Sequence, residues 1–570
     1  MLAGVLGLTF AQKPSGVLPA EESRQVTADS LLADLGCSGC HPGVEASSNV
    51  THKAPDLSHA GLRYQEGYLF EYLQHPVTVR RHIGLSRMPD FRFSPKEALA
   101  LTLFLARQLA VPPGRGTSPP GVSDPPGPTL SPQGLALEGN RILKALECTT
   151  CHTLFGEGTP KAVDLSTTGY RLKTPWLKQY LVDPARFDGE DTPMPASFFH
   201  SSGGKDEYEG MTPGSAEMLV TVVEYLSSLG RRQGGRLQKA FDEARGTFPH
   251  VDHNLGQKIF LSQNCLACHR HPSLHPWRKH TAPDLSGEGN RVSPQWLRTY
   301  LKAPRPVRPF GFIPGSGSRM PDFSLTDREV EVMAAYLSTR KDPQPDLSPP
   351  LTDRPLYPYE RRKARRLIEE KLSCLGCHRL GDRGGRIGPS LSNIPSRLQP
   401  QFVYRVISDP QGVIPGTVMP KTVMPEKNLE LLTRFLLDET GQESPVNYLS
   451  LVDYPLHLPP DAGDGEDIYG LYCASCHGIR GDGKGFNREF LSVAPAVLSD
   501  PVLLSQRGDD TLFDGIYSGA AILGKSPLMP PFGQTLDRSE IGWVITHLRD
   551  LCNCEGAPWS RENTSNTVSP

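Results

Sequence analysis

The sequence predicts an all-α protein built from five small domains in tandem, joined by proline-rich linkers. A Cys-x-x-Cys-His motif occurs five times, and its first cysteines lie 99 to 117 residues apart, which fits one small domain each. Helical patterns with one apolar face precede and follow the motifs. A chain of 570 residues is also too long for one hydrophobic core, and its 55 prolines and 55 glycines indicate long connections.

The five motifs account for ten of the twelve cysteines. Two thiols at this spacing add to the two vinyl groups of one porphyrin, and the histidine after them lies under the iron. A zinc ribbon would use Cys-x-x-Cys pairs without an obligatory histidine. The sequence therefore predicts five covalently bound haem c groups with their iron. Repeats one to five are defined by Cys37, Cys40 and His41; Cys148, Cys151 and His152; Cys265, Cys268 and His269; Cys374, Cys377 and His378; and Cys473, Cys476 and His477.

A methionine followed by proline comes after each motif and is the candidate sixth ligand of each iron. A thioether opposite histidine is typical of high-potential haem irons, and the proline stiffens the ligand loop. The predicted ligands are Met88, Met194, Met320, Met419 and Met529. Met419 is preferred to Met424 because it lies 16 residues before an aromatic residue of the last helix, as Met88 and Met320 do.

Other sixth ligands compete with this set. In repeat two, Met211 is the alternative to Met194, which is favoured because proline follows it. Histidine would give bis-histidine irons of lower potential. The histidine competitors are His52, His82, His200 and His280.

Each repeat has the same order of elements. A helix leads into the motif, and a turn of the form small–Pro–x–apolar follows it at 54–57, 282–285, 388–391 and 494–497, while 162–165 lacks the proline. The carbonyls of Pro55, Pro283, Pro389 and Pro495 are candidate acceptors for the ring N–H of the axial histidine. An amphipathic segment and a last helix complete the repeat. Ser94, Thr326 and Asp537 open capping boxes for the last helices of repeats one, three and five.

These patterns predict the boundaries of the domains. The predicted ranges are 1–27 for a signal-like segment and N-terminal tail, 28–110, 133–231, 250–340, 359–441 and 462–552 for haem domains one to five, 111–132 and 341–358 for proline-rich linkers, and 553–570 for a C-terminal tail. Repeats one and three share Ser-Arg-Met-Pro-Asp-Phe at 86–91 and 318–323. We therefore expect a duplicated two-haem module followed by a separate fifth domain.

Repeat five resembles a class I cytochrome c through Tyr469 and Tyr472 before its motif, Gly478–Gly485 after it, and Met529 with the following Pro-Pro-Phe. Repeats one to four resemble the cytochrome c domains of bacterial respiratory chains in their Ala-Pro-Asp-Leu-like turns and Met-Pro-Asp-Phe-like loops. The resemblance implies a pentahaem c-type cytochrome with histidine and methionine ligands. It implies electron transfer between a donor and an acceptor rather than catalysis.

Two further readings stay open: a peroxidase-like enzyme with one displaceable sixth ligand, and a subunit of a larger oxidoreductase or oxidase. The net charge of −2 gives no sign of a nucleic-acid partner. Because haem is attached outside the cytoplasm, we expect a periplasmic or otherwise exported protein, and residues 2–11 read as the end of a signal core with Ala11 as its cleavage residue. No run is long enough to span a membrane. For the remaining cysteines, Cys552 and Cys554, three states stay open: free thiols, a strained disulfide with each other, or an intermolecular disulfide.

Overall fold

A computed structural model of the chain confirms the all-α class, with 54% helix and 3% strand. No helix among the described residues is long and apolar enough to cross a bilayer. The signal-like segment lies outside the described residues, as do the competing ligands Met211, His52, His82, His200 and His280 and most of both predicted linkers. The structure describes residues 26–44, 53–79, 84–112, 130–189, 192–198, 214–275, 282–311, 319–341, 354–439, 441, 447–453 and 464–557.

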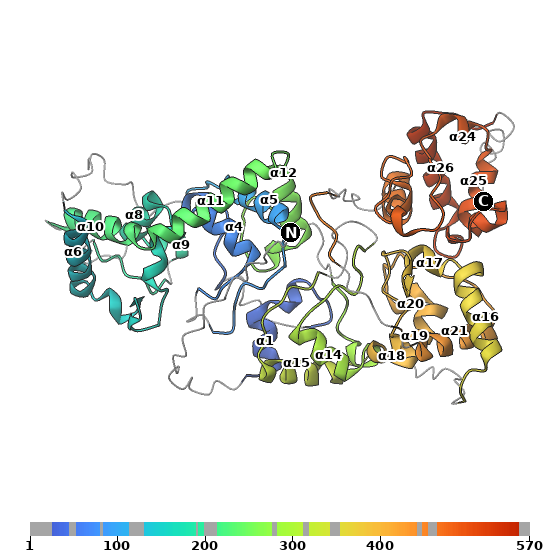
Figure 1. The fold of residues 1–570 in the computed structure, drawn as a ribbon, viewed down its shortest axis with the longest axis horizontal. Coiled ribbons are helices and arrows are strands. Elements are labelled where there is room, and N and C mark those ends of the chain that lie inside the picture. The colour runs from blue at the N-terminus through green and yellow to red at the C-terminus, as the bar shows by residue number, and fades with distance from the viewer. Residues whose placement is uncertain are drawn as a thin grey trace, which may run out of the picture.

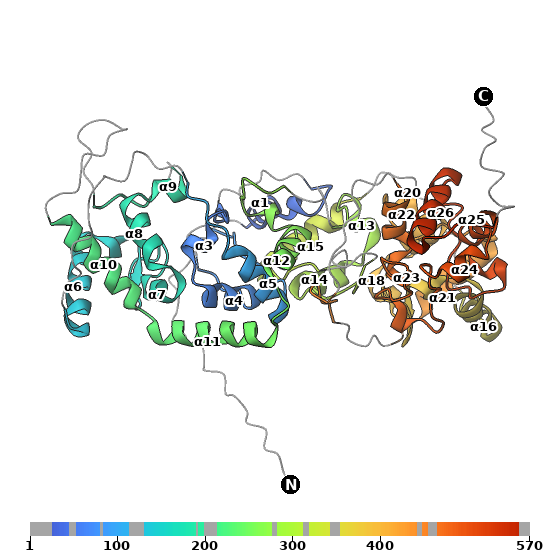
Figure 2. The same ribbon diagram turned by 90° about the horizontal axis from the view of Figure 1, so that it is seen from above.

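Five helical bundles, each around its own hydrophobic core, make up most of the described chain. We name each bundle after the first cysteine of the motif that touches its core. Along the long axis of the molecule the order is the Cys148, Cys265, Cys37 and Cys374 bundles, and the Cys473 bundle lies beside the Cys374 bundle (Figures 1 and 2). This order in space differs from the order of the motifs along the chain.

Three bundles are each built mainly from one repeat. The Cys148 bundle contains α6 (Pro132–Ala145), η3 (Cys148–Thr150), η4 (Leu165–Thr167), α7 (Thr168–Arg171), α8 (Thr174–Val182), α9 (Ala185–Asp188) and α10 (Ser215–Ser228). The Cys374 bundle contains α16 (Pro358–Arg366), η6 (Leu367–Lys371), α17 (Cys374–Cys377), α18 (Ile394–Arg397), α19 (Pro400–Ser408), α20 (Pro410–Val413) and α21 (Glu426–Asp438). The Cys473 bundle contains α22 (Gly465–Tyr472), α23 (Ala474–His477), η7 (Arg488–Phe490), α24 (Pro501–Ser505), α25 (Asp509–Ser518), η8 (Ala520–Leu523) and α26 (Arg538–Cys552).

The remaining two bundles exchange halves between repeats one and three. The Cys37 bundle joins α1 (Ala28–Leu35) and η1 (Cys37–Gly39) of repeat one to α13 (Glu288–Arg291), α14 (Pro294–Lys302) and α15 (Asp327–Thr339) of repeat three. The Cys265 bundle joins α12 (His253–Ser262) and η5 (Cys265–Ala267) of repeat three to α3 (Ala60–Arg63), α4 (Glu66–Gln74) and α5 (Pro95–Leu105) of repeat one. The ranges 28–110 and 250–340 therefore pack across each other rather than each on itself.

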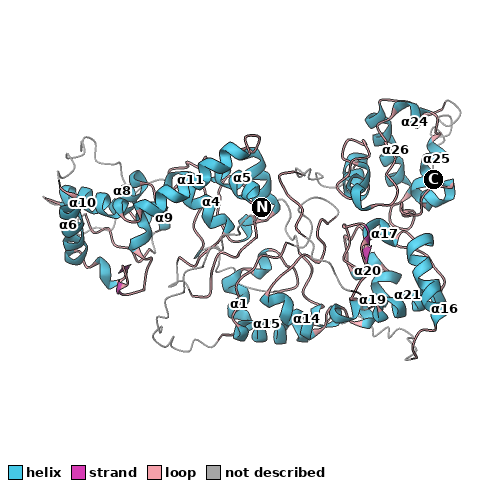
Figure 3. Cartoon of the chain, viewed as in Figure 1, coloured by secondary structure: helices cyan, strands magenta, loops and turns pink. Residues whose placement is uncertain are grey.

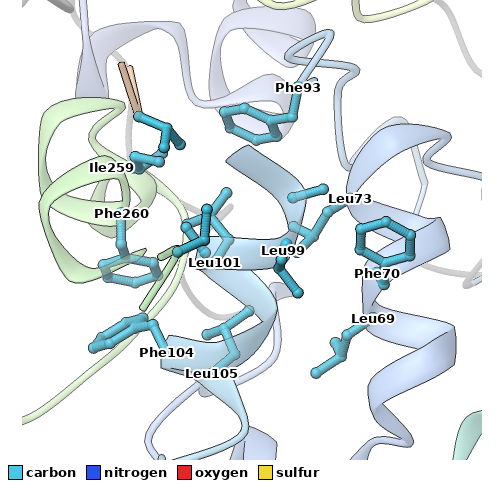
Figure 4. Close-up of a cluster of buried hydrophobic side chains, with 14 of the residues drawn as sticks. Leu69, Phe70, Leu73, Phe93, Leu99, Leu101, Phe104, Leu105, Ile259 and Phe260 are labelled. Carbon is cyan, nitrogen blue, oxygen red and sulfur yellow. The ribbon is translucent and has the colours of Figure 1, made fainter. Parts of the chain in front are cut away.

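Figure 4 shows the exchanged core of the Cys265 bundle. Phe104 and Leu101 on α5 face Ile259 and Phe260 on α12, although more than 150 residues separate them in the chain. The rings of Phe104 and Phe260 have centroids 5.2 Å apart, and Ile259 is fully buried. The first helix of one repeat thus packs on the last helix of the other.

The predicted helix-start signals act as expected. The side chains of Ser94, Thr326 and Asp537 accept hydrogen bonds from the third backbone N–H of α5, α15 and α26, and the glutamates at Glu97, Glu329 and Glu540 complete the three capping boxes. The predicted amphipathic segments are α4, α8, α14 and α19. Two short antiparallel strand pairs follow the motifs of repeats two and four (Figure 3). They are β1 (Thr153–Leu154) with β2 (Glu157–Gly158) and β3 (Arg379–Leu380) with β4 (Arg383–Gly384).

Several features lie beyond the predicted domains, among them residues 447–453, whose Leu451 and Val452 belong to the core of the Cys265 bundle. The predicted ranges left residues 232–249 unassigned, but α11 (Arg231–Thr247) runs through them and buries Leu237, Phe241 and Ala244. Phe241 and Ala244 join the core of the Cys265 bundle, so α11 connects this bundle to the end of the Cys148 bundle (Figure 2). Cys552 and Cys554 form a disulfide with each other, at the end of α26.

Candidate haem sites

Each motif forms one tight turn that brings its two cysteines and its histidine to the same side. In all five, the backbone N–H of the histidine donates to the carbonyl of the first cysteine, at 2.8–3.0 Å. In repeats one to three a residue with positive φ precedes the turn and ends the first helix, and Gly36, Glu147 and Asn264 occupy this position. The local sequence therefore fixes the geometry that two thioether bonds and one axial histidine require.

Each of the five motif histidines makes the same kind of hydrogen bond. In each, Nδ1 lies 2.7–3.0 Å from a backbone carbonyl: Pro283 for His41, Val163 for His152, Pro55 for His269, Pro389 for His378 and Ala496 for His477. A carbonyl only accepts, so Nδ1 carries the hydrogen and Nε2 keeps the lone pair that can bind iron. Pro389 is the acceptor for the histidine of its own repeat, as predicted. Pro55 and Pro283 also accept, but each from the histidine of the other repeat, and Ala496 accepts instead of Pro495.

Burial sets the ionisation of the motif side chains. It raises the pKa of the thiols of Cys37, Cys265, Cys268, Cys377 and Cys473 to about 12, and that of Cys374 to about 11. It lowers the pKa of the imidazoles of His41, His378 and His477, which favours the neutral form that can bind a metal. Apart from Cys151, which is exposed, the motif cysteines themselves are half-buried, which leaves one edge of each attachment turn open to solvent.

The cavity of the Cys148 bundle brings a predicted pair of ligands together. Cys148, His152 and Met194 line one cavity, whose remaining walls are mostly apolar. The other wall residues are Leu143, Leu165, Leu181, Pro195, Ser197, Phe198, Val222 and Leu226. A thiol, an imidazole and a thioether facing one apolar cavity fit a covalently attached haem with histidine and methionine on its iron.

The other predicted methionines are distributed unevenly over the cores. Met529 packs against the core that Cys473 touches, and Met320 packs against the core that Cys37 touches. In repeat four it is Met424 that packs against the core beside Cys374. Met419, the prediction from spacing, lies in the preceding loop, where its carbonyl accepts from Gln411. Met88 lies one residue after Arg87, in the segment where repeats one and three cross.

Buried arginines give a second test of whether these sites suit a haem. The Nε atoms of Arg63 and Arg171 are buried and lack a hydrogen-bond partner among the described residues. Arg291 and Arg397, at the same place in α13 and α18, help to lower the pKa of His41 and His378, after burial itself. Arg63 pairs with Asp188 at 3.8 Å and Arg291 pairs with Glu288, so these two already have a carboxylate partner. The buried Nε–H groups of Arg63 and Arg171 are donors that suit the buried propionates of a haem.

These arginines were missed at the sequence level, although a signal exists. Each lies eight residues after the residue whose carbonyl holds an axial histidine: Pro55, Val163, Pro283 and Pro389 precede Arg63, Arg171, Arg291 and Arg397. A repeat-by-repeat alignment of the turns would have found this constant spacing. Repeat five has no arginine at the corresponding position, which is Leu504 for Ala496.

Two pairs of motifs lie in direct contact. Asn264 Nδ2 donates to the carbonyl of Gly39 at 2.8 Å, and a Cβ placed on Gly39 would lie 2.6 Å from that of Ala267, so the turns of repeats one and three touch. Asn487 Nδ2 donates to the carbonyl of Gly376 at 2.8 Å and lies 3.5 Å from Cys476 Sγ, which joins the turns of repeats four and five.

Two further junctions link the pairs to their neighbours. Tyr64 and Leu172 form an antiparallel bridge between the Cys265 and Cys148 bundles, and Val292 and Leu398 form the same bridge between the Cys37 and Cys374 bundles. In both, an arginine of the set just described precedes each bridged residue. The equivalence of these junctions is consistent with the duplicated two-haem module.

Two parts of the chain match known families. Residues 254–341 match the family described as Cytochrome c, and residues 460–548 match the family described as Cytochrome C oxidase, cbb3-type, subunit III. No curated protein and no solved structure matches the chain. The chain therefore contains two cytochrome c domains, which support a haem-based electron-transfer cytochrome with covalently bound haem c and iron.

Proposed function

We propose that the chain is a multihaem c-type cytochrome of bacterial respiratory type, which carries electrons between two redox partners through five covalently bound haems. The observation that carries this proposal is the fivefold repetition of one site: a Cys-x-x-Cys-His turn whose histidine Nδ1 donates to a backbone carbonyl at 2.7–3.0 Å. Three of these sites lie outside the segments that match a family. Their identical hydrogen bond supports the same cofactor in all five.

A haem c iron with histidine and methionine ligands supplies reversible one-electron chemistry. The chain's own residues fix the state of that site. The carbonyl acceptor holds the imidazole ring in one orientation and raises the basicity of Nε2. The apolar cores keep water away, and burial together with a thioether ligand favours the reduced state. The side chains Arg63 and Arg171 offer charge to the propionate edge, where burial would otherwise be costly.

The arrangement of the bundles supports long-range transfer. Electron tunnelling falls steeply with distance, so a relay needs neighbouring attachment sites close together. The turns of Cys37 and Cys265 touch, as do those of Cys374 and Cys473, and arginine-containing junctions connect the remaining neighbours. We therefore propose the relay order Cys148, Cys265, Cys37, Cys374, Cys473, with partners at the two ends.

We propose that the chain is not an enzyme, because each motif has a methionine candidate for its sixth position. The rival is a peroxidase-like site, and repeat two is where the sequence departs most from the pattern. The position of Met194 in the same cavity as His152 favours a filled coordination shell there. Adding cyanide or peroxide to the oxidised and reduced protein tests this. An unchanged spectrum is expected, and a ligand-bound haem would favour the enzyme.

A second candidate function concerns assembly. The match of residues 460–548 to a subunit III family of cbb3-type oxidase favours a cytochrome subunit of a larger respiratory complex. The Cys473 bundle ends the proposed relay, so it is the natural point of contact with a larger partner. Native electrophoresis of gently solubilised membranes with haem staining checks this. Co-migration with an oxidase supports assembly, and a free band supports a mobile carrier.

We also propose that the protein works outside the cytoplasm, in the periplasm of a bacterium, since covalent haem attachment takes place there. Cell fractionation with haem staining tests the location. The main experiment for the function is a spectroscopic redox titration combined with haem quantification on the purified chain. Five haems per chain with positive, methionine-type potentials are expected. Fewer haems, or several strongly negative potentials, would contradict the proposal.

A further inference from the structure

We propose that the two irons of repeats one and three take their ligands crosswise: Met320 binds the iron under His41, and Met88 binds the iron under His269. This inference rests on the proposed function, because it assigns ligands to haems that the function requires. It differs from the order of the sequence, in which Met88 follows His41 and Met320 follows His269.

The axial histidines provide the first argument. His41 Nδ1 lies 2.8 Å from the carbonyl of Pro283, and His269 Nδ1 lies 3.0 Å from the carbonyl of Pro55. Each histidine is therefore held by the turn of the other repeat. In repeats two, four and five the histidine is held by a turn 11 to 19 residues further along its own repeat.

The backbone around these turns continues the exchange. The N–H groups of Ala282 and Leu285 donate to the carbonyls of Cys40 and Pro42, at 3.1 and 3.0 Å. In the other site the N–H of Leu57 donates to the carbonyl of Arg270 at 3.0 Å. Two separate backbone contacts with the same relation show that the exchange is symmetric and involves more than the histidine rings.

The hydrophobic cores show that the exchange includes the loops that contain Met88 and Met320. Met320 and Phe323 pack against the core that contains Leu31 and touches Cys37. Phe93 belongs to the core that touches Cys265, and Phe91 packs against that core. Leu85, three residues before Met88, packs against the core that touches Cys37, so the chain passes from one bundle to the other at Met88. The packing of Met320 assigns this methionine to the His41 site, and the two-fold relation between the repeats then assigns Met88 to the His269 site.

The ligand loops themselves cross between the two bundles. Asp90 and Asp322 exchange backbone hydrogen bonds at 2.8 Å in both directions. Arg87 pairs with Glu329 of the other repeat at 2.8 Å, and Arg319 pairs with Glu97 at 3.0 Å. Both glutamates belong to capping boxes, so Arg87 is anchored at α15 of the Cys37 bundle and Arg319 at α5 of the Cys265 bundle. Each segment crosses to the other bundle only after this arginine, within the ligand loop, where Asp90 meets Asp322.

A disulfide test decides the exchange without reference to haem. A Cβ placed on Gly43 would lie 2.9 Å from Ser286 Cβ, whereas a sequential fold would bring Gly43 to the equivalent Ser58. The same Cβ would lie 2.1 Å from Asp284 Oδ1, so both cysteine variants also carry Asp284→Ala and the equivalent Asp56→Ala. We expect the variant Gly43→Cys with Ser286→Cys to form a disulfide under mild oxidation, detected by mass spectrometry after proteolysis. The matched variant Gly43→Cys with Ser58→Cys should stay reduced. The opposite pattern would overturn the proposal.

A ligand test then assigns the methionines. Ferric haem with a methionine ligand has a far-red charge-transfer band, so its amplitude counts methionine-bound irons. In a parent variant lacking the first haem, Cys37→Ser with Cys40→Ser, four such irons are expected. Adding Met320→Ala should leave the band unchanged, whereas adding Met88→Ala should remove a further quarter of it. The reverse result would overturn the crosswise assignment.

The reciprocal parent, Cys265→Ser with Cys268→Ser, should invert the two outcomes and so exclude a general loss of structure. The failure of the proposed function looks different. A purified wild-type chain without haem would overturn the function and the ligand assignment together. The disulfide pattern would still report whether the two repeats exchange their halves.

Discussion

The two pairs of touching motifs reach the same contact by different routes. The turns of Cys37 and Cys265 meet through Asn264 and the carbonyl of Gly39, and those of Cys374 and Cys473 meet through Asn487 and the carbonyl of Gly376, both at 2.8 Å. The first pair shares its halves between two repeats. The second pair docks two bundles that are each built mainly from one repeat.

This difference shows that exchange is not needed to bring two attachment sites together. What exchange changes is the dependence of each site on the rest of the chain. Neither repeat one nor repeat three contains all the residues that enclose its own motif. The loss of one helix should therefore disturb two sites in the exchanged pair and only one site in the docked pair.

The largest effect is expected from a cavity in the exchanged core. Phe260 is 1% exposed and packs on Phe104, so Phe260→Ala should cost about 3–5 kcal/mol. Hydrogen exchange measured by mass spectrometry should increase in α12 and α5, which belong to different repeats. It should then increase in the Cys37 bundle, which is built from the same two repeats. The matched variant Leu548→Ala, in α26 of the docked pair, should affect the Cys473 bundle and spare the Cys374 bundle. Equal spreading in both variants would contradict the comparison.

The buried ion pair between the repeats should come next. The side chains of Arg319 and Glu97 are 7% and 1% exposed, so Arg319→Met leaves a buried carboxylate without its partner and should cost about 3 kcal/mol in urea unfolding. Arg549 and Asp509 form a more exposed pair inside the Cys473 bundle, at 13% and 29%. Arg549→Met is the control, and a smaller loss is expected there. A loss below about 1 kcal/mol for Arg319→Met would mean that the repeats do not interlock through this pair.

The asparagine contacts should show a smaller and unequal effect. Asn487 is fully buried, donates to Gly376 and accepts from the N–H of Arg386 at 2.8 Å, so Asn487→Leu leaves two backbone groups unpaired. Asn264→Gly, which suits the positive φ at this position, leaves one, at Gly39. At about 1 kcal/mol for each orphaned group, the docked pair should lose more than the exchanged pair. Circular dichroism of the Soret band, which splits when haems couple, should collapse only for Asn487→Leu. Collapse in Asn264→Gly would show that the exchanged contact depends on this side chain.

The same comparison separates the features that the sequence predicts from those that it does not. The motifs, the capping boxes at Ser94, Thr326 and Asp537, and the amphipathic segments were predictable because each is a local pattern. The exchange was not predictable, because repeats one and three carry the same turn, the same ligand loop and the same apolar faces. Either half fits either partner, as in domain swapping. Helix α11 was missed because Gly234 and Gly235 weaken its pattern, and the packing of Leu237 and Phe241 outweighs their cost.

At the candidate haem sites, too, only local features were predictable. The spacing within each motif predicts the candidate axial histidine and attachment cysteines, and the turn after it predicts the carbonyl acceptor. Spacing selected Met419, but the core of the Cys374 bundle contacts Met424, because the packing of the loop depends on residues distant in sequence. Asn264 and Asn487 have no sequence signal, since their partners belong to other repeats.

The smallest predicted effect is an acid dependence of the exchanged pair. Burial opposes ionisation of Glu329, but hydrogen bonds from Arg87 and Thr326 outweigh it and hold the pKa of this carboxyl below its usual value. Because the folded pKa is lowered, the stability from this group is present at neutral pH and is lost as the pH falls through the folded pKa. Urea midpoints between pH 3 and 7 should therefore fall less steeply in Arg87→Met than in the wild type. Parallel curves would mean that Arg87 does not hold this carboxylate.

The most direct test of the crosswise account is an experimental structure of the haem-loaded, full-length chain at a resolution that identifies the sixth ligands. The account predicts that the sulfur of Met320 lies on the iron of the haem attached to Cys37 and Cys40, opposite His41, and that Met88 lies on the iron opposite His269. If Met88 lies opposite His41, the exchange between repeats one and three is contradicted.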